Sequence, residues 1–221
     1  MASNQGVGGS TPPGRAILSM KADLNKIEKI AKKYFVGANS CHDWDHVKRV
    51  CDIAFIIGRE EKANLGIVAI ASLLHDIKKT EEMEQKGQIF HALSGAQEAA
   101  KILTELRFSR GIVQGVKHCI EAHRYRNNIK PKTIEAKVLS DADKIDALGA
   151  VGVGRSLLFA GKVGARLHNG DAKDIYQTSM YGPDDTLYRE YMVKLRHLPK
   201  RMFTKTGKKI ARESFIYEGF Y

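Results

Sequence analysis

The sequence predicts an all-α fold, on two observations. Apolar residues recur every three or four positions, as in Leu24, Ile27, Ile30 and Ala31, so that they share one face of a helix. The alternation of apolar and polar residues that marks a half-buried strand is absent from these segments. With 221 residues and 43% hydrophobic content, the chain is long enough to bury one substantial core. We therefore expect a single helical bundle.

The elements follow in chain order from this periodicity. Residues 1–16 are expected to form a disordered leader, because the first 14 are rich in Gly, Ser, Thr and Pro and show no period. The helical domain then occupies residues 17–221. After the first apolar face, a second helix is indicated by Val47, Val50, Cys51, Ala54 and Phe55. Further helices are expected at 65–75, 91–106, 110–123, 134–146, 149–160, 186–198 and 206–220.

Breaker residues support these boundaries. Pro131 precedes a new helix, and glycines followed by a Tyr-Gly-Pro turn signal make residues 161–183 the expected long loop. A loop of that length in a compact domain is often functional. Arg166, His168 and Asn169 make it a candidate lid over an anionic ligand.

Composition limits the class of protein. No apolar run reaches the roughly 18 residues that span a bilayer, and the N-terminus lacks the apolar core of a signal peptide, so a cytoplasmic location is expected. Three cysteines, an odd number without metal-finger spacing, are expected to be reduced core residues.

The net charge of +11 is unevenly distributed. Between Arg189 and Arg212, nine Lys or Arg residues stand against one acid, Glu190. Such a surface attracts phosphate-rich ligands, either nucleotides or nucleic acid. The alternative is an ordinary solvated helix face.

The most informative motif is His75-Asp76, which closes an apolar helix in LLHDIKK. A buried carboxylate needs a partner, and a metal ion is one that also employs the neighbouring imidazole. His46 in HVKRV and Asp143 in DADKIDAL are two further candidate ligands in helical segments.

These motifs, H-x-x-R-V, L-L-H-D-I-x-K and A-D-x-I-D-A-L, resemble the HD superfamily of metal-dependent phosphohydrolases from about His42 to Ala150. Beyond them, GVGRSLLFAG and residues 179–212 look like the tail of a branch of stand-alone HD hydrolases, some of which act on nucleotides. The resemblance implies an HD-type helical bundle whose metal ligands are His46, His75, Asp76 and Asp143. Periodicity alone does not choose among Asp141, Asp143 and Asp146, because that helix is apolar on nearly every face.

Three residues are expected beside the ligands. Asp141 and Asp146 are interpreted as acceptors that orient the histidines or bind basic side chains. His42 is a rival ligand, four residues before His46, but SCHD is typical of the approach to a helix capped by Ser40 or Asp43. His42 is therefore expected behind the ligands or on the surface.

Two imidazoles and two carboxylates suit Mn, Fe, Co, Ni or Zn better than Mg. Four protein ligands leave about two positions open for water and a phosphate oxygen. The expected function is a divalent-metal-dependent phosphohydrolase that acts on a nucleotide or small phosphate ester by attack of metal-bound hydroxide on phosphorus. A closed structural zinc site is disfavoured, because cysteine ligands are missing from the set.

Basic residues near the motifs are candidate phosphate ligands. Lys79 matches the Lys of the family's H-D-I-G-K form, although Lys78 replaces its Gly. Arg49 is expected to clamp Asp76 or a phosphate. For both residues, a salt bridge that orients the ligand acids is the alternative.

His91 and His123 have two interpretations. HALSGA, which begins at His91, resembles the H-P-x-x-G segment by which some HD subfamilies bind a second metal. We favour instead neutral imidazoles near the phosphate that protonate the leaving group, because the other half of the two-metal signature, H-H-E, is replaced by EAHR. Arg124 and Arg126 then become further phosphate contacts.

Two other functions remain open. An HD-fold di-iron oxygenase would require His91 and His123 as ligands. A degenerate HD domain that binds nucleic acid through its basic C-terminal segment is disfavoured, because the metal set is intact and Tyr191 and Phe203 do not form an interleaved stacking pattern.

Overall fold

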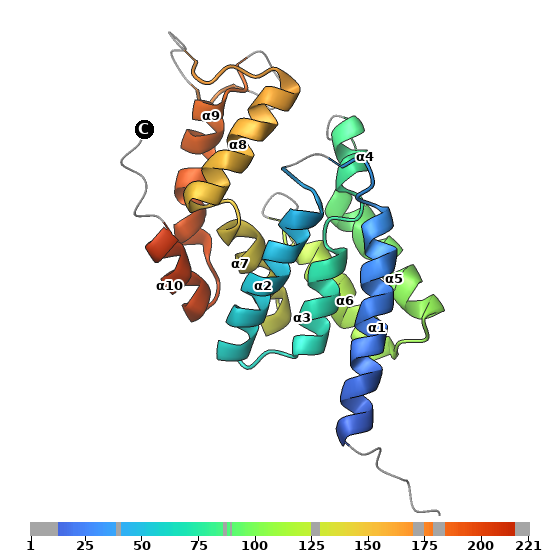
Figure 1. The fold of residues 1–221 in the computed structure, drawn as a ribbon. Coiled ribbons are helices and arrows are strands. Elements are labelled where there is room, and N and C mark those ends of the chain that lie inside the picture. Colours follow the sequence, from blue (N-terminus) through green and yellow to red (C-terminus); the bar gives the residue numbers. More distant parts are fainter. Residues whose placement is uncertain are drawn as a thin grey trace, which may run out of the picture.

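The computed structural model describes residues 13–38, 41–85, 88, 90–124, 129–169, 175–178 and 184–214, and within them every regular element is a helix (Figure 1). In chain order these are α1 (Pro13–Lys33), α2 (Trp44–Glu60), α3 (Leu65–Leu74), α4 (Lys79–Glu84), α5 (His91–Glu105), α6 (Arg110–Ala122), α7 (Ile134–Ile145), α8 (Gly149–Val163), α9 (Leu187–Val193), the 3-10 helix η2 (Leu195–Arg201) and α10 (Lys205–Ser214). The predicted all-α class is confirmed. None of these helices is long and apolar enough to cross a membrane.

Helix α3 lies at the centre of the bundle. It packs against α1, α2, α5, α6 and α7, and its apolar sequence LGIVAIASLL fits a helix surrounded by others. Fully buried side chains from four surrounding helices, Ile57, Leu103, Ile120 and Leu139, form one core with Leu74. Because α3 ends at Leu74, the next residues, His75 and Asp76, emerge inside the bundle.

Most predicted helix starts agree with the structure. Asp43 caps α2 by accepting from the His46 amide at 2.9 Å, while Ser40 lies outside the described residues. α1 begins at Pro13, inside the predicted leader, where a proline in the first turn loses no helical hydrogen bond. The remaining leader residues, 1–12, lie outside the described part of the chain.

Two predicted segments differ from the structure. The short helix α4 was not expected, and the helix expected at 186–198 is divided into α9 and η2. Pro199 lies inside η2 and supplies no amide hydrogen, so a continuous α-helix is disfavoured just before it. Of the last predicted helix, residues 215–220 lie outside the described residues.

Helices α8, α9 and α10 form a second group beside α7, and α10 also contacts α2 (Figure 1). The corner between α7 and α8 is tight: a Cβ on Gly152 would lie 2.2 Å from the Ala147 carbonyl oxygen. α10 is joined to α7 by Asp141, which accepts from the amides of Phe203 at 2.9 Å and Thr204 at 2.8 Å. The second group is thus tied to the helix that carries Asp143.

The three residues of the proposed lid make contacts around the start of α9. Asn169 is buried, donates to the Asp184 carbonyl at 2.8 Å and accepts from the Thr186 hydroxyl. Arg166 pairs with Asp184, and His168 stacks on Tyr188 with ring centroids 4.3 Å apart. They hold the start of α9. Residues 170–174 and 179–183 of this loop lie outside the described residues.

Candidate metal centre

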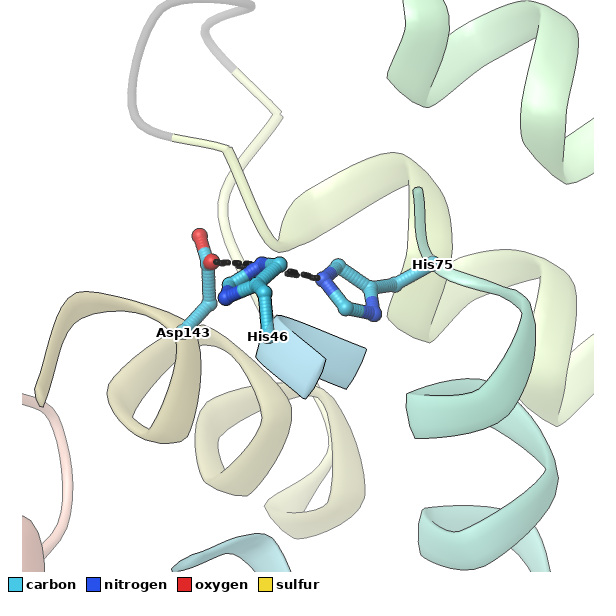
Figure 2. Close-up of side chains that lie close together, drawn as sticks. All are labelled: His46, His75 and Asp143. Carbon is cyan, nitrogen blue, oxygen red and sulfur yellow. Dashed lines mark hydrogen bonds and ion pairs between the residues drawn. The ribbon is translucent and has the colours of Figure 1, made fainter. Parts of the chain in front are cut away.

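Six histidine and aspartate side chains, carried by α2, α5 and α7 and by the ends of α3 and α6, meet inside the bundle. The first cluster is His46, His75 and Asp143, shown in Figure 2, and the second is Asp76, His91 and His123. Within each cluster one ligand atom per residue lies within 4.8 Å of the others. The candidate ligands His46, His75, Asp76 and Asp143 therefore lie together, and His91 and His123 lie beside them.

Asp76 lies between the two clusters. Its Oδ2 atom is 3.6 Å from Nε2 of His46 and 3.8 Å from Nε2 of His75. Its Oδ1 atom is 3.1 Å from Nε2 of His91 and 3.7 Å from Nε2 of His123. The carboxylate thus presents one oxygen to each cluster. Asp143 completes the first side, with Oδ1 3.5 Å from Nε2 of His46.

All four imidazoles are oriented by an acceptor on Nδ1. His75 and His123 contact the carbonyl oxygens of Ser72 and Ile120, at 2.8 and 2.6 Å. His46 contacts Asp146 at 2.7 Å, and His91 contacts Glu82 at 2.8 Å. A carbonyl or carboxylate oxygen only accepts, so each Nδ1 carries a hydrogen and Nε2 is the ring nitrogen that faces the centre.

The donor set fits divalent metal ions. The Nε2 atoms of His46 and His75 are 3.3 Å apart, and those of His91 and His123 are 3.4 Å apart. Lone pairs so close repel one another unless a cation or proton lies between them. Nitrogen and carboxylate donors, with the far ring nitrogens held by acceptors, are the usual surroundings of a transition metal in a protein.

Burial and charge keep most ligands in the forms that bind metal. Burial lowers the pKa of His75 and lowers that of His123 to about 3. Burial raises the pKa of Asp76 and Asp143, but the surrounding imidazoles outweigh it, so Asp76 falls well below its usual pKa and Asp143 falls to about 2. His46 is the exception: burial lowers its pKa, yet hydrogen bonds to Asp146 and Asp76 give a net increase.

Asp146 is held by two arginines in addition to His46. Arg49 donates through Nε at 2.6 Å and Nη2 at 3.1 Å, and Arg155 donates through Nη1 at 2.8 Å. The expectation that Arg49 clamps Asp76 or a phosphate is therefore corrected. Arg49 lies one turn after His46 on α2, so both side chains reach the same carboxylate. Arg155 was missed, although it is the single charge on α8 before Lys162, a signal of a buried partner.

Glu82, which the sequence did not distinguish, has the same role for His91. It is 2% exposed and accepts from His91, from Lys79 at 2.7 Å and from Arg124. Burial raises the pKa of Glu82, but the bond to His91 and the charge of Lys79 produce a net decrease. Lys79 and Arg124, both expected to bind phosphate, are thus paired with a carboxylate. In the sequence, nothing distinguishes Glu82 from the other acids of the charged run EEMEQK.

The structure revises the expectation for Asp141 and agrees with that for His42. Asp141 orients no histidine; it binds the Phe203 and Thr204 amides, because two residues along α7 turn it about 200° away from Asp143. His42 belongs to neither cluster, with its Nδ1 3.4 Å from Cys41 Sγ and its ring centroid 5.6 Å from that of His46. Arg126 lies outside the described residues.

A cavity of about 220 Å³ opens on the two clusters. Asp76, Asp143, His91 and His123 line one side, next to four cationic side chains, Lys79, Arg124, Lys144 and Arg155. The wall formed by α8, α9 and η2 adds apolar side chains, Phe159, Leu187, Leu195 and Leu198, together with the Glu190–Lys194 ion pair. The cavity therefore combines the ionic groups of the clusters with apolar surface from α8, α9 and η2.

Comparison with known proteins gives a consistent family. The HD domain family model matches residues 43–148. The uncharacterized protein YpgQ of Bacillus subtilis strain 168 is 32% identical over 206 residues, covering 86% of this chain and 87% of YpgQ. Ribonuclease Y of Borrelia garinii is 33% identical over 125 residues, which cover 57% of this chain and 22% of that enzyme.

Comparison with solved structures gives the same family. Bacillus subtilis YpgQ in complex with ADP has a TM-score of 0.63 and 30% identity, covering 86% of this chain and 89% of that chain. A predicted HD superfamily hydrolase from an uncultured Thermotogales bacterium has a TM-score of 0.61 and 28% identity, covering 86% of this chain and 84% of that chain. With the motif residues gathered in one centre, these similarities show that the chain belongs to the HD superfamily of hydrolases.

Proposed function

We propose that this protein is a metal-dependent phosphohydrolase that acts on a nucleotide or another small phosphate ester. The observation that carries the proposal is the common orientation of four buried imidazoles, each with Nδ1 on an acceptor and Nε2 toward Asp76. When bound, divalent ions there would acidify a water molecule and neutralise charge on a phosphate oxygen.

His46, His75, Asp76 and Asp143 would hold one ion. His91 and His123, with the second oxygen of Asp76, would hold another. We assign His91 and His123 this ligand role in place of the proton transfer that the sequence EAHR favoured. The reason is that the Nε2 atoms of the two imidazoles lie against each other and against Asp76. Imidazole-rich sites favour Mn, Fe, Co, Ni or Zn over Mg.

The chain's own cations would bind the phosphate. Lys79 and Lys144 line the cavity, and burial lowers the pKa of both ammonium groups. An anion that enters would stabilise their charged forms. Lys144 is positioned by a hydrogen bond to the Ser140 carbonyl at 2.9 Å, and Arg124 is positioned by Glu82.

The apolar surface of the cavity supports a substrate with a carbon skeleton beyond its phosphate. Phe159, Leu195 and Leu198 line the same cavity as the clusters and offer ring and aliphatic surface. A nucleoside has the size and character for such a wall. The structure of YpgQ in complex with ADP is in accord with this substrate class.

The test is a substrate screen of the metal-loaded protein with nucleoside mono-, di- and triphosphates and simple phosphate esters. Turnover should cease with chelator and return with Mn, Co or Ni better than with Mg. Turnover that persists after demonstrated metal removal would exclude the proposal. Turnover that requires iron and dioxygen, and stops under anaerobic conditions, would indicate an oxygenase instead.

Nucleic acid is the alternative substrate class, because part of this chain is similar in sequence to Ribonuclease Y. The basic residues Lys205, Lys208, Lys209 and Arg212 are exposed on α10, as on a solvated helix face. Including single-stranded RNA in the screen separates the two classes. Tight RNA binding without turnover of any small phosphate would favour the binding function.

A further inference from the structure

Helix α8 has two different faces. Its inward face carries Arg155 and Phe159 and lines the cavity. Its outward face carries seven residues over three turns without a single charged or polar side chain: Ala150, Val151, Val153, Gly154, Leu157, Leu158 and Gly161. Such a face is unusual in a chain of which 28% is charged.

The outward face is uncovered by the described residues. Val151, Leu157 and Leu158 are 46, 45 and 51% exposed, and a Cβ built on Gly154 or Gly161 would have nothing within 4 Å. A contiguous apolar surface of this kind marks an interaction site, because burying it removes apolar area from water.

The described chain ends beside the beginning of this face. Ser214, the last residue of α10, packs against Gly149, the first residue of α8: a Cβ on Gly149 would lie 3.3 Å from the Ser214 carbonyl oxygen. Residues four apart on a helix form a ridge, so Gly149 is followed along α8 by Val153, Leu157 and Gly161. A segment that follows Ser214 therefore starts at one end of an apolar ridge.

The residues after Ser214 have the composition to cover that ridge. Four of the seven in FIYEGFY are aromatic and a fifth is isoleucine, whereas aromatic residues make up 8% of the whole chain. In an extended conformation seven residues span about 23 Å, at roughly 3.3 Å each. The 15 residues of α8 span about 22 Å.

We propose that residues 215–221 bind along the outward face of α8, from Gly149 toward Gly161. The segment would exclude water from Val153 and Leu157 and hold α8 against the cavity, and with it Arg155 on Asp146. This proposal does not depend on the identity of the substrate.

A double-mutant cycle tests the contact. Leu157→Ala is measured by chemical unfolding in the full chain and in a chain that ends at Ser214. If the segment covers Leu157, the substitution should raise the unfolding equilibrium constant at least about 5-fold in the full chain and less than 2-fold in the shortened chain, because contacting groups are not additive. Ile56→Ala on α2, a residue 54% exposed, is the matched control and should have the same effect in both chains.

Hydrogen exchange gives a second measurement that does not need the shortened chain. Phe215→Ser with Phe220→Ser in the full chain should accelerate amide exchange in α8 at least about 10-fold and leave α6 unchanged, because α8 would open without its cover. Additive effects in the cycle together with unchanged exchange in α8 would refute the proposal. A dimer in light scattering that Leu157→Asp dissociates, and that persists in the chain ending at Ser214, would also refute it and assign the face to a second copy.

Discussion

The two ligand clusters are built on the same plan, with one difference. Each contains one histidine that follows a helix and contacts the carbonyl three residues earlier: His75 after α3 and His123 after α6. Each also contains one histidine near the start of a helix that contacts a buried carboxylate: His46 on Asp146 and His91 on Glu82.

Even the supporting cations correspond. Asp146 is neutralised by Arg49 and Arg155, and Glu82 by Lys79 and Arg124. The difference is Asp143, which gives the first cluster a carboxylate of its own, whereas the second has only its share of Asp76. The first cluster should therefore bind its ion more tightly, and the second should be the more open to substrate.

The largest expected effect comes from the residue that the clusters share. Asp76→Ala should lower metal affinity at both sites by at least about 100-fold, because loss of residues that only support the ligands already costs 10- to 100-fold. Metal content by mass spectrometry after dialysis measures this. Asp45→Ala, an exposed acid paired with Lys48, is the control and should retain all metal. Full occupancy of Asp76→Ala would contradict the shared-ligand arrangement.

The next effect separates the clusters. His75→Ala should remove the more tightly bound ion, whereas His123→Ala should leave about one ion per chain and lose the other, since the two residues occupy equivalent positions. Calorimetric titration with Mn or Co, with circular dichroism to verify folding, distinguishes the variants. Identical losses in both would show that the clusters do not act as separate sites.

A smaller effect is expected from the supporting carboxylates. Asp146→Asn and Glu82→Gln should each weaken metal binding about 10- to 100-fold, the former at the first cluster and the latter at the second. Asp141→Asn is the matched control on α7: it should lower the stability of the fold, through Phe203 and Thr204, and leave metal affinity unchanged. Equal metal loss in Asp141→Asn would assign it a ligand role after all.

The smallest effect is a difference in pH dependence. The raised pKa of His46 means that, without metal, this ring holds a proton above its usual pKa of about 6.5. An ion at the first cluster must displace that proton, so affinity there should fall by up to about tenfold per pH unit below the pKa of His46. At the second cluster, His123, whose pKa is lowered to about 3, imposes no such competition. Competition titrations between pH 8 and 5.5 measure both, and an acid-insensitive first site would contradict the assignment.

Much of the fold was predictable because it depends on local patterns. The apolar period gave the starts of α3, α5, α6, α7 and α8 at their observed residues. α4 escaped notice, since six residues of mixed charge carry no period that distinguishes a helix from a turn. The division of α9 from η2 was signalled by Pro199, whose effect the apolar pattern concealed.

The sequence by itself determined that the imidazoles and carboxylates of His46, His75-Asp76 and Asp143 are buried and require partners, because apolar residues flank each of them along the chain. Only the tertiary structure decided which partners they have. Glu82 binds His91, which lies nine residues later in the sequence, and Arg124, which lies 42 residues later. Arg49 and Arg155, on different helices, both bind Asp146. Charged side chains look alike along a chain, and their roles are fixed by which helix ends the packing of the core brings together.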